Sequence, residues 1–245
     1  MPNILVTVCA RGGSKGIPGK NIKKVGGHPL LWYTAAVAVE FARKYGADLG
    51  FSTDSQEILS LGKEYGLPRD YRRPAELGND VVGKPHVIKD LMLFNEAKHR
   101  KTYDYVIDLD VTSPVRTMRD IEECLSLMVE TPEALTVFSV SPCHRNPYFN
   151  MVEAKSDGFY GLVKQSKVTA RQQAPKVYDI NGSIYVYARE ALDCDDPRAV
   201  TERTKVYVMD HLCFDLDEPD DYNYLAYLLD TGKLKFSPQK GLTNE

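Results

Sequence analysis

Short apolar runs alternate with longer amphipathic segments along the first half of the chain. Residues 4–10 are apolar and rich in β-branched side chains, which predicts a buried strand, and residues 29–45 predict a helix that ends at Gly46. The alternation continues with strands at 47–52, 103–109 and 134–140 and helices at 55–65, 84–100 and 118–130. Strands that alternate with helices of this length are typical of crossover units. The pattern predicts an α/β, Rossmann-like fold whose mostly parallel sheet is covered by helices on both faces.

The alternation stops after Ser141. Residues 142–176 are rich in Pro, Asn, Gly and Gln, and two strand-like pieces near 148–153 and 158–164 predict a hairpin. This segment is too small to bury a core of its own, so we interpret it as an arm that packs on a second subunit, the alternative being a long loop. The core pattern then resumes with strands at 180–187, 205–209 and 214–216 and a last helix at 219–230. We therefore expect residues 1–245 to form one α/β domain with an inserted dimerisation arm.

Composition narrows the class of protein. The 245 residues include 31 Lys and Arg and 34 Asp and Glu, a formal net charge of −3, and 43% are apolar. This balance is typical of a soluble globular protein and argues against nucleic acid or a membrane surface as the partner. The most apolar stretch, 30–39, is too short to span a bilayer, and the N-terminal pattern differs from that of a signal peptide. The five cysteines include no CxxC pair, so we expect reduced thiols and a cytoplasmic location.

The loop after the first predicted strand carries candidate chemistry. It reads Arg11-Gly12-Gly13-Ser14-Lys15-Gly16-Ile17-Pro18-Gly19-Lys20-Asn21. Open parallel sheets bind ligands at the carboxyl ends of their strands. Glycines let backbone N–H groups approach a ligand, and cations favour a polyphosphate. The loop is neither a Walker loop nor a GxGxxG loop, and the alternative to a phosphate site is a flexible, solvated turn.

Two carboxylates near the C-terminus suggest a metal site. Phe214-Asp215-Leu216-Asp217 alternates apolar and acidic residues, so a strand would point both carboxylates to one face, as two Mg²⁺ ligands require. In the alternative interpretation, Asp217 only caps the helix that starts at Pro219 and Asp215 is solvated.

Further motifs follow the first loop in order: Arg73-Pro74-Ala75-Glu76-Leu77, Thr112-Ser113-Pro114-Val115-Arg116-Thr117, Arg171-Gln172-Gln173, Asn181-Gly182-Ser183-Ile184-Tyr185 and Phe214-Asp215-Leu216-Asp217. Together with the first loop, these motifs resemble those of the acylneuraminate cytidylyltransferase family, the CMP-sialic acid synthetases and their relatives. It implies transfer of CMP from CTP to the anomeric hydroxyl of a nine-carbon 2-keto sugar acid, with Mg²⁺ as cofactor and release of pyrophosphate.

The resemblance also implies a role for each motif. The nucleotide would bind to Arg11, Gly12, Gly13, Ser14, Lys15, Lys20, Asn21 and Arg73. The sugar acid would meet Asp110, Thr112, Ser113, Arg171, Gln172, Asn181 and Tyr185. Asp215 and Asp217 would hold the metal and, with Arg11 and Lys20, form the catalytic set, and residues 142–176 would join a homodimer.

The chain departs from the family pattern at two places. Asp110 stands where sialic-acid-activating members usually carry Gln, and a carboxylate there would repel the substrate's carboxylate unless it meets hydroxyls, an amine or a metal. Legionaminate or another amino- or deoxy-sugar acid therefore fits better than N-acetylneuraminate. Residues 81–85 also differ from the usual Ser/Thr-rich turn, and Lys84 there either contacts a nucleotide phosphate or lies in solvent.

Two other functions remain open at this point. Asp108-Leu109-Asp110 matches the metal-binding DxD of GT-A-type glycosyltransferases, although their donor lacks a γ-phosphate and needs no Lys15 or Lys20. A non-catalytic nucleotide-sensing module would keep the fold but would not need Asp215 and Asp217 together.

Overall fold

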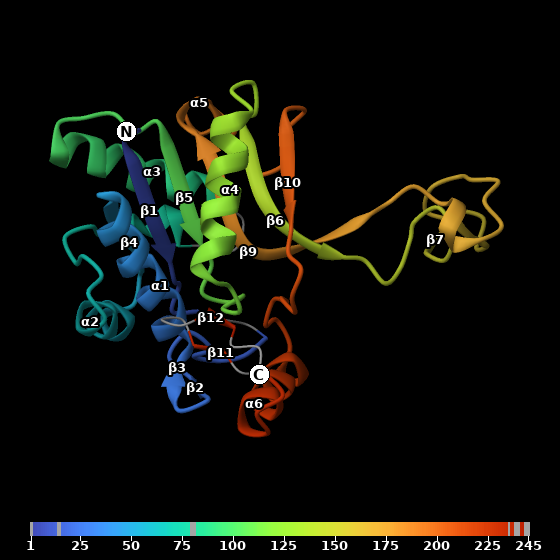
Figure 1. Ribbon diagram of the computed structural model, residues 1–245, viewed down its shortest axis with the longest axis horizontal. Coiled ribbons are helices and arrows are strands. Elements are labelled where there is room, and N and C mark those ends of the chain that lie inside the picture. The colour runs from blue at the N-terminus through green and yellow to red at the C-terminus, as the bar shows by residue number, and fades with distance from the viewer. Residues whose placement is uncertain (1, 14–15, 79–81, 235, 238–240, 243–245) are drawn as a thin grey trace.

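A six-stranded sheet forms the centre of the fold in the computed structural model, which describes residues 2–13, 16–78, 82–234, 236–237 and 241–242. Its strands, in spatial order, are β10 (Thr204–Val208), β6 (Thr136–Pro142), β9 (Tyr178–Ala188), β5 (Tyr105–Leu109), β1 (Ile4–Cys9) and β4 (Asp48–Ser52) (Figure 1). β1 is parallel to β4 and β5, and β10 is parallel to β6, whereas β9 is antiparallel to both of its neighbours. The predicted α/β fold with a mostly parallel sheet is confirmed.

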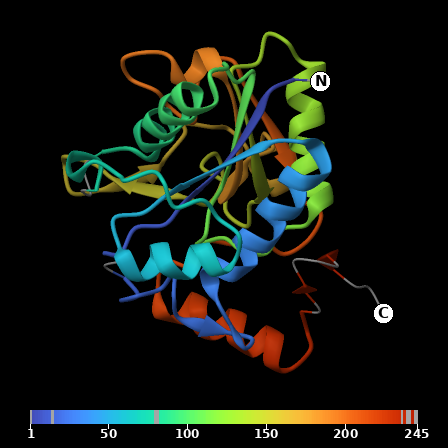
Figure 2. The ribbon, with the colours of Figure 1, turned by 90° about the vertical axis from the view of Figure 1, so that its left-hand side faces the viewer.

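Helices cover both faces of this sheet (Figure 2). α1 (Leu30–Tyr45) and α4 (Met118–Glu130) lie on one face, and α3 (Lys84–His99) and the short α5 (Arg189–Leu192) lie on the other. The helix α2 (Gln56–Glu64) packs beside α1, and α6 (Pro219–Asp230) packs on the hairpin of β2 (Lys24–Val25) and β3 (His28–Pro29). The remaining short elements are η1 (Ala75–Leu77), η2 (Arg171–Gln173), β7 (Val152–Ala154), β8 (Tyr160–Leu162), β11 (Phe236–Ser237) and β12 (Gly241–Leu242).

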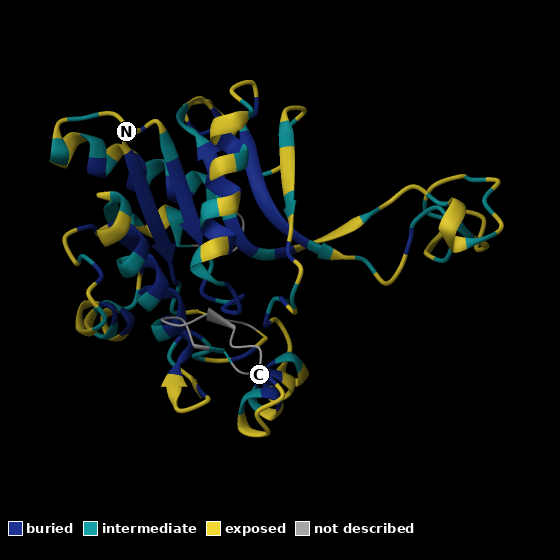
Figure 3. Cartoon of the chain, in the orientation of Figure 1, coloured by how far each residue is buried: buried dark blue, intermediate teal, exposed yellow. Residues whose placement is uncertain are grey.

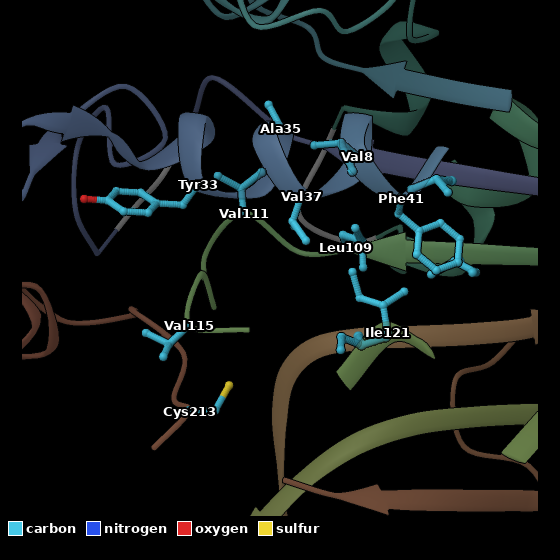
Figure 4. Close-up of a cluster of buried hydrophobic side chains, with 14 of the residues drawn as sticks. Val8, Tyr33, Ala35, Val37, Phe41, Leu109, Val111, Val115, Ile121 and Cys213 are labelled. Carbon is cyan, nitrogen blue, oxygen red and sulfur yellow. The ribbon is translucent and has the colours of Figure 1, made fainter. Parts of the chain in front are cut away.

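Strand β1 is buried along its whole length because helices cover both of its sides (Figure 3). Val8 packs in one apolar cluster with Val37 and Phe41 of α1 (Figure 4). Leu5 and Cys9 belong to a second cluster on the side of α3. Since side chains alternate along a strand, Thr7 also faces the α3 side, where its hydroxyl takes part in the polar cluster described below.

The segment 142–176 projects from the sheet as an arm between β6 and β9 (Figure 1). Its strands β7 and β8 pair as an antiparallel hairpin, which confirms the hairpin predicted from the sequence. Several large apolar side chains of the arm are open to solvent: Val152 is 62% exposed, Phe159 72% and Tyr160 70%. The hairpin therefore buries little of its own apolar surface.

The strand predicted at 214–216 is wrong. This segment pairs with no strand among the described residues, and its Leu216 N–H instead donates to the carbonyl of Thr112, in a loop, at 2.9 Å. The segment is also anchored upstream, where His211 Nε2 lies 2.9 Å from Asp120 Oδ2. Burial opposes the charge on His211, but the hydrogen bond and charge of Asp120 raise the pKa of its imidazole above the ordinary value.

A buried arginine ties the loop after β5 to the rest of the fold. The Arg116 side chain is fully buried, and its Nε donates to Ser183 Oγ at 2.8 Å and its Nη1 to Thr34 Oγ1 at 2.9 Å. Its Nη2 donates to the carbonyl oxygens of Ser113, at 2.6 Å, and of Asp110. Arg116 thereby links α1, β9 and the loop that carries Asp110.

We expect Arg116→Lys to lower the free energy of unfolding by about 2 kcal/mol or more, because lysine keeps the charge but lacks the planar fork, so buried acceptors lose their donors. Urea denaturation measures the loss. Arg119→Lys is the matched control, since the Arg119 side chain on α4 is 74% exposed, and it should leave stability nearly unchanged. Equal stability of the Arg116 variant and the control would contradict this role.

Candidate active site

The end of β1 at Cys9 and the loops that follow β1 and β5 line one cavity of about 340 Å³. Residues predicted for the nucleotide, the sugar acid and the metal line it together: Arg11, Lys20, Asn21, Arg73, Lys84, Asp110, Thr112 and Asp217. Parallel strands bring their carboxyl ends to the same edge of a sheet, which explains why segments far apart in sequence meet here.

The loop after β1 is held by a hydrogen bond between its two ends and by one to Asp54, which follows β4. Asn21 Nδ2 donates to the carbonyl of Arg11 at 2.8 Å, and the N–H of Gly12 donates to Asp54 Oδ1 at 2.7 Å. At Gly16, a Cβ atom would lie 2.1 Å from the carbonyl oxygen of Asp217, so the close approach requires glycine. A Cβ at Gly13 would meet no atom. Ser14 and Lys15 lie outside the described residues.

Two of the predicted nucleotide-binding cations have fixed positions. Lys20 Nζ donates to the carbonyl oxygen of Leu216 at 2.5 Å and lies 3.3 Å from Asp217 Oδ1. The Arg73 guanidinium donates to Ser52 at the end of β4, with Nε 2.9 Å from Oγ and Nη2 2.8 Å from the carbonyl oxygen. Both side chains therefore reach the cavity wall with part of their donors already engaged.

Lys84, the first residue of α3, is paired with two carboxylates. Its Nζ lies 2.6 Å from Asp108 Oδ2 and 2.6 Å from Asp110 Oδ2. Burial would lower the pKa of Lys84, but the charges of Asp108 and Asp110 raise it well above its ordinary value. The sequence did not indicate this pairing, because α3 and β5 meet only in the folded chain.

The two candidate metal ligands differ in exposure. Asp217 is 73% exposed, whereas Asp215 is partly buried, and its Oδ1 has no hydrogen-bond partner among the described residues. Burial raises the pKa of Asp215, a hydrogen bond from Thr112 opposes the rise, and the charges of Asp110 and Asp217 add to it. A buried carboxylate oxygen without a donor, beside further carboxylates, fits a divalent cation. Within the described parts of the chain, no three His, Cys, Asp or Glu side chains converge as a complete metal site, so water or substrate would supply the other ligands.

Some residues predicted for the sugar acid lie beneath the cavity rather than on its wall. Ser113 is fully buried, and its Oγ lies within hydrogen-bond distance of the carbonyl oxygens of Asn181, at 2.6 Å, and of Phe214, at 2.9 Å. Asn181 is also buried, with Oδ1 accepting from Ser139 Oγ at 2.7 Å. Tyr185 is half-buried on β9, opposite Asp108 in the strand register. Direct contacts of these residues with a sugar stay a prediction.

Arg171 and Gln172 stand apart from the cavity in the same chain. Both lie in η2 on the arm, where Arg171 Nη2 donates to the carbonyl of His144 at 3.2 Å. They line a second hollow of about 420 Å³ at the base of the arm. The structure thus divides the predicted sugar-binding residues between the sheet edge and the arm.

Sequence reasoning missed other residues of the cavity. Cys9 ends β1 and lines the wall, and burial followed by the charge of Asp108 raises the pKa of its thiol to about 12, so it stays protonated. Asp54 holds the loop after β1 through Gly12. A signal for Asp54 was available, because it follows the strand β4 closely and the carboxyl ends of parallel strands form the site.

Cations on a glycine-bearing loop and carboxylates at neighbouring strand ends define a nucleotide-binding α/β enzyme. More particularly, the chain belongs to the cytidylyltransferase family, whose family model matches residues 5–193. The family recognised from the motifs is confirmed, and the protein is a nucleotidyltransferase rather than a glycosyltransferase or a nucleotide sensor.

Two curated relatives match the chain over most of its length. The chain is 35% identical over 230 residues to the CMP-N,N'-diacetyllegionaminic acid synthase of Campylobacter jejuni, which covers 94% of this chain and 96% of that protein. It is 34% identical, with the same coverage, to the post-translational flagellin modification protein B of Campylobacter coli. Its fold is similar to that of CMP:2-keto-3-deoxy-manno-octonic acid synthetase complexed with CTP, with a TM-score of 0.68 at 16% identity over 94% of this chain and 99% of that one. Among the described residues, no helix is both long and apolar enough to cross a bilayer.

Proposed function

We propose that the protein transfers CMP from CTP to the anomeric hydroxyl of a nine-carbon 2-keto sugar acid of the legionaminate or N-acylneuraminate type, with release of pyrophosphate. The observation that carries this proposal is the contact of Lys20, a cation of the loop after β1, with the Asp215–Asp217 segment. The 35% identity to a CMP-N,N'-diacetyllegionaminic acid synthase supports the sugar class.

In this proposal, cations of the sheet edge neutralise the triphosphate. Arg11, Lys20 and Arg73 line the same cavity, and their charges favour the β- and γ-phosphates and the pyrophosphate that leaves. Lys20 is already oriented by the Leu216 carbonyl, so little reorganisation is needed when the nucleotide binds. The attacking oxygen comes from the sugar, so no nucleophilic side chain is required.

Asp215 and Asp217 would hold Mg²⁺. When bound, the ion would offset the negative charge that builds on the α-phosphoryl group and on the departing pyrophosphate. Asp215 Oδ1, which has no hydrogen-bond partner among the described residues, and the exposed carboxylate of Asp217 are the ligands that we propose.

Asp110 is suited to accept hydrogen bonds from the sugar acid. The positive charge of Lys84 lowers the pKa of Asp110, although burial opposes this, and keeps its carboxylate ionised at the cavity wall. The same charge weakens the repulsion between Asp110 and the carboxylate of the substrate. A sugar acid that presents a hydroxyl or an amide N–H at this point would be favoured.

Pyrophosphate release tests the proposal directly. We expect turnover to be highest with CTP among the four nucleoside triphosphates, and with acylamino-substituted nine-carbon 2-keto acids among the sugar acids, in the presence of Mg²⁺. An enzyme that consumes none of these pairs would overturn the proposal.

The metal assignment predicts a selective loss of rate. Asp215→Asn and Asp217→Asn conserve shape, so both variants should fold, yet each should lose roughly 10²-fold in kcat because one charge-stabilising group is removed. Initial rates across a Mg²⁺ titration measure the effect, and Asp220→Asn on α6 is the control. Wild-type rates and an unchanged Mg²⁺ dependence in both variants would refute the assignment.

The position of Arg171 on the arm leads to a prediction about assembly. We propose that residues 142–176 join a homodimer through their exposed apolar side chains and carry Arg171 to the partner's cavity. Lys20→Ala and Arg171→Ala should each be nearly inactive alone. Their mixture, after subunit exchange, should regain about a quarter of the wild-type activity, because half of the dimers are mixed and one of their two cavities is intact. Sedimentation as a monomer, or no recovery in exchanged mixtures, would contradict the arrangement.

A further inference from the structure

The cluster around Lys84 has the form of a two-carboxylate cation site with an ammonium in the cation's place. Asp108 and Asp110 are separated by one residue at the end of β5, and Lys84 Nζ is 2.6 Å from an Oδ2 atom of each. We propose that the Lys84 ammonium replaces a divalent cation between these carboxylates. It closes the pair to metal and holds Asp110 at the cavity wall.

Asp108 has no access to solvent that could stabilise its charge. Its side chain is 0% exposed on the α3 side of the sheet, and Thr7 Oγ1 donates to its Oδ1 at 2.8 Å. A buried carboxylate requires a counter-charge, and Lys84 supplies it at ion-pair distance from Oδ2. Removal of Lys84 would therefore leave a buried anionic position that attracts another cation or a proton.

Asp110 is held at both of its oxygens. Oδ1 accepts from the backbone N–H and from the hydroxyl of Thr112, each at 3.0 Å, and Oδ2 accepts from Lys84 at 2.6 Å. The carboxylate cannot turn toward an incoming metal without giving up these contacts. Lys84 is thus a positioning residue, which acts on the cavity through Asp110.

The second carboxylate pair, Asp215 and Asp217, is held less closely. Lys20 Nζ lies 3.3 Å from Asp217 Oδ1, the carboxylate of Asp217 is 73% exposed, and Asp215 Oδ1 is buried with no hydrogen-bond donor in the described part of the chain. Lys84 therefore forms an ion pair with both carboxylates of the first pair, whereas Lys20 contacts only Asp217 in the second pair and Asp215 Oδ1 has no donor among the described residues. Because Lys84 already occupies the space between Asp108 and Asp110, a divalent cation binds at Asp215 instead.

Mn²⁺ binding without nucleotide tests this inference independently of turnover and of the proposed function. Electron paramagnetic resonance counts the ions bound by the wild type, Lys84→Met and Lys84→Met/Asp110→Asn. We expect Lys84→Met to bind one Mn²⁺ per chain more than the wild type, and the double variant to lose that additional ion. Lys84→Arg, which keeps a cation, should match the wild type.

Two results would overturn the inference. One is a folded Lys84→Met protein that binds no additional Mn²⁺. The other needs no change at Lys84: Asp110→Asn alone should leave the number of bound ions unchanged, so a loss of Mn²⁺ in this variant would show that the wild-type pair already binds metal. This second measurement decides the question even where Lys84→Met fails to fold, and the circular dichroism of each variant reports folding.

Discussion

The active-site edge depends on the buried guanidinium of Arg116. Four buried acceptors from three parts of the chain converge on it: the hydroxyls of Thr34 and Ser183 and the carbonyls of Asp110 and Ser113. Burial lowers the pKa of Arg116, because a charged group loses hydration inside the protein. The hydrogen bonds to these four acceptors offset that loss of hydration. Because Nη2 donates to the backbone carbonyl of Asp110, the carboxylate of Asp110 starts from a defined position, and its contacts with Lys84 and Thr112 depend on that position.

The loop after β5 positions the other charged groups of the cavity through a series of contacts. Asp110 and Asp108 engage Lys84, and the carbonyl of Thr112 receives the N–H of Leu216. Leu216 in turn offers its carbonyl to Lys20, which places a cation of the first loop beside Asp217. A single chain of hydrogen bonds thus connects the loop after β5, the acidic segment near the C-terminus and the loop after β1.

The elements of the fold were predictable because their signals are local. β-Branched apolar runs predicted β1, and a glycine at positive φ ends α1 at Gly46 as expected. Phe214–Leu216 shows where this reasoning fails, since the period-2 pattern is present but the hydrogen-bond partner is a loop rather than a strand. An alternation of apolar and polar residues requires only that one side of the segment faces protein and the other faces solvent, and it does not require pairing with a strand.

The candidate site was predictable where chemistry and chain position coincide, as at Arg11, Lys20 and Arg73. Lys84 was left between a phosphate contact and solvent because its partners, Asp108 and Asp110, lie on another element. Ser113 and Asn181 belong to the motifs, yet their polar atoms hydrogen-bond to neighbouring segments below the cavity. A motif alone therefore does not distinguish a residue that binds ligand from one that stabilises the surrounding structure.

The residues proposed for the nucleotide and those proposed for the sugar acid lie on different segments of the chain. The cations that we propose for the triphosphate lie in the loop after β1 and at Arg73, whereas Asp110 and Arg171, which we propose for the sugar acid, lie in the loop after β5 and on the arm. A structure at 16% identity keeps this fold with a TM-score of 0.68, so the sheet tolerates wide changes in sequence. Under the assignment proposed above, substitutions at Asp110, Lys84 or the arm would change which sugar acid is accepted and would leave the nucleotide side of the cavity intact.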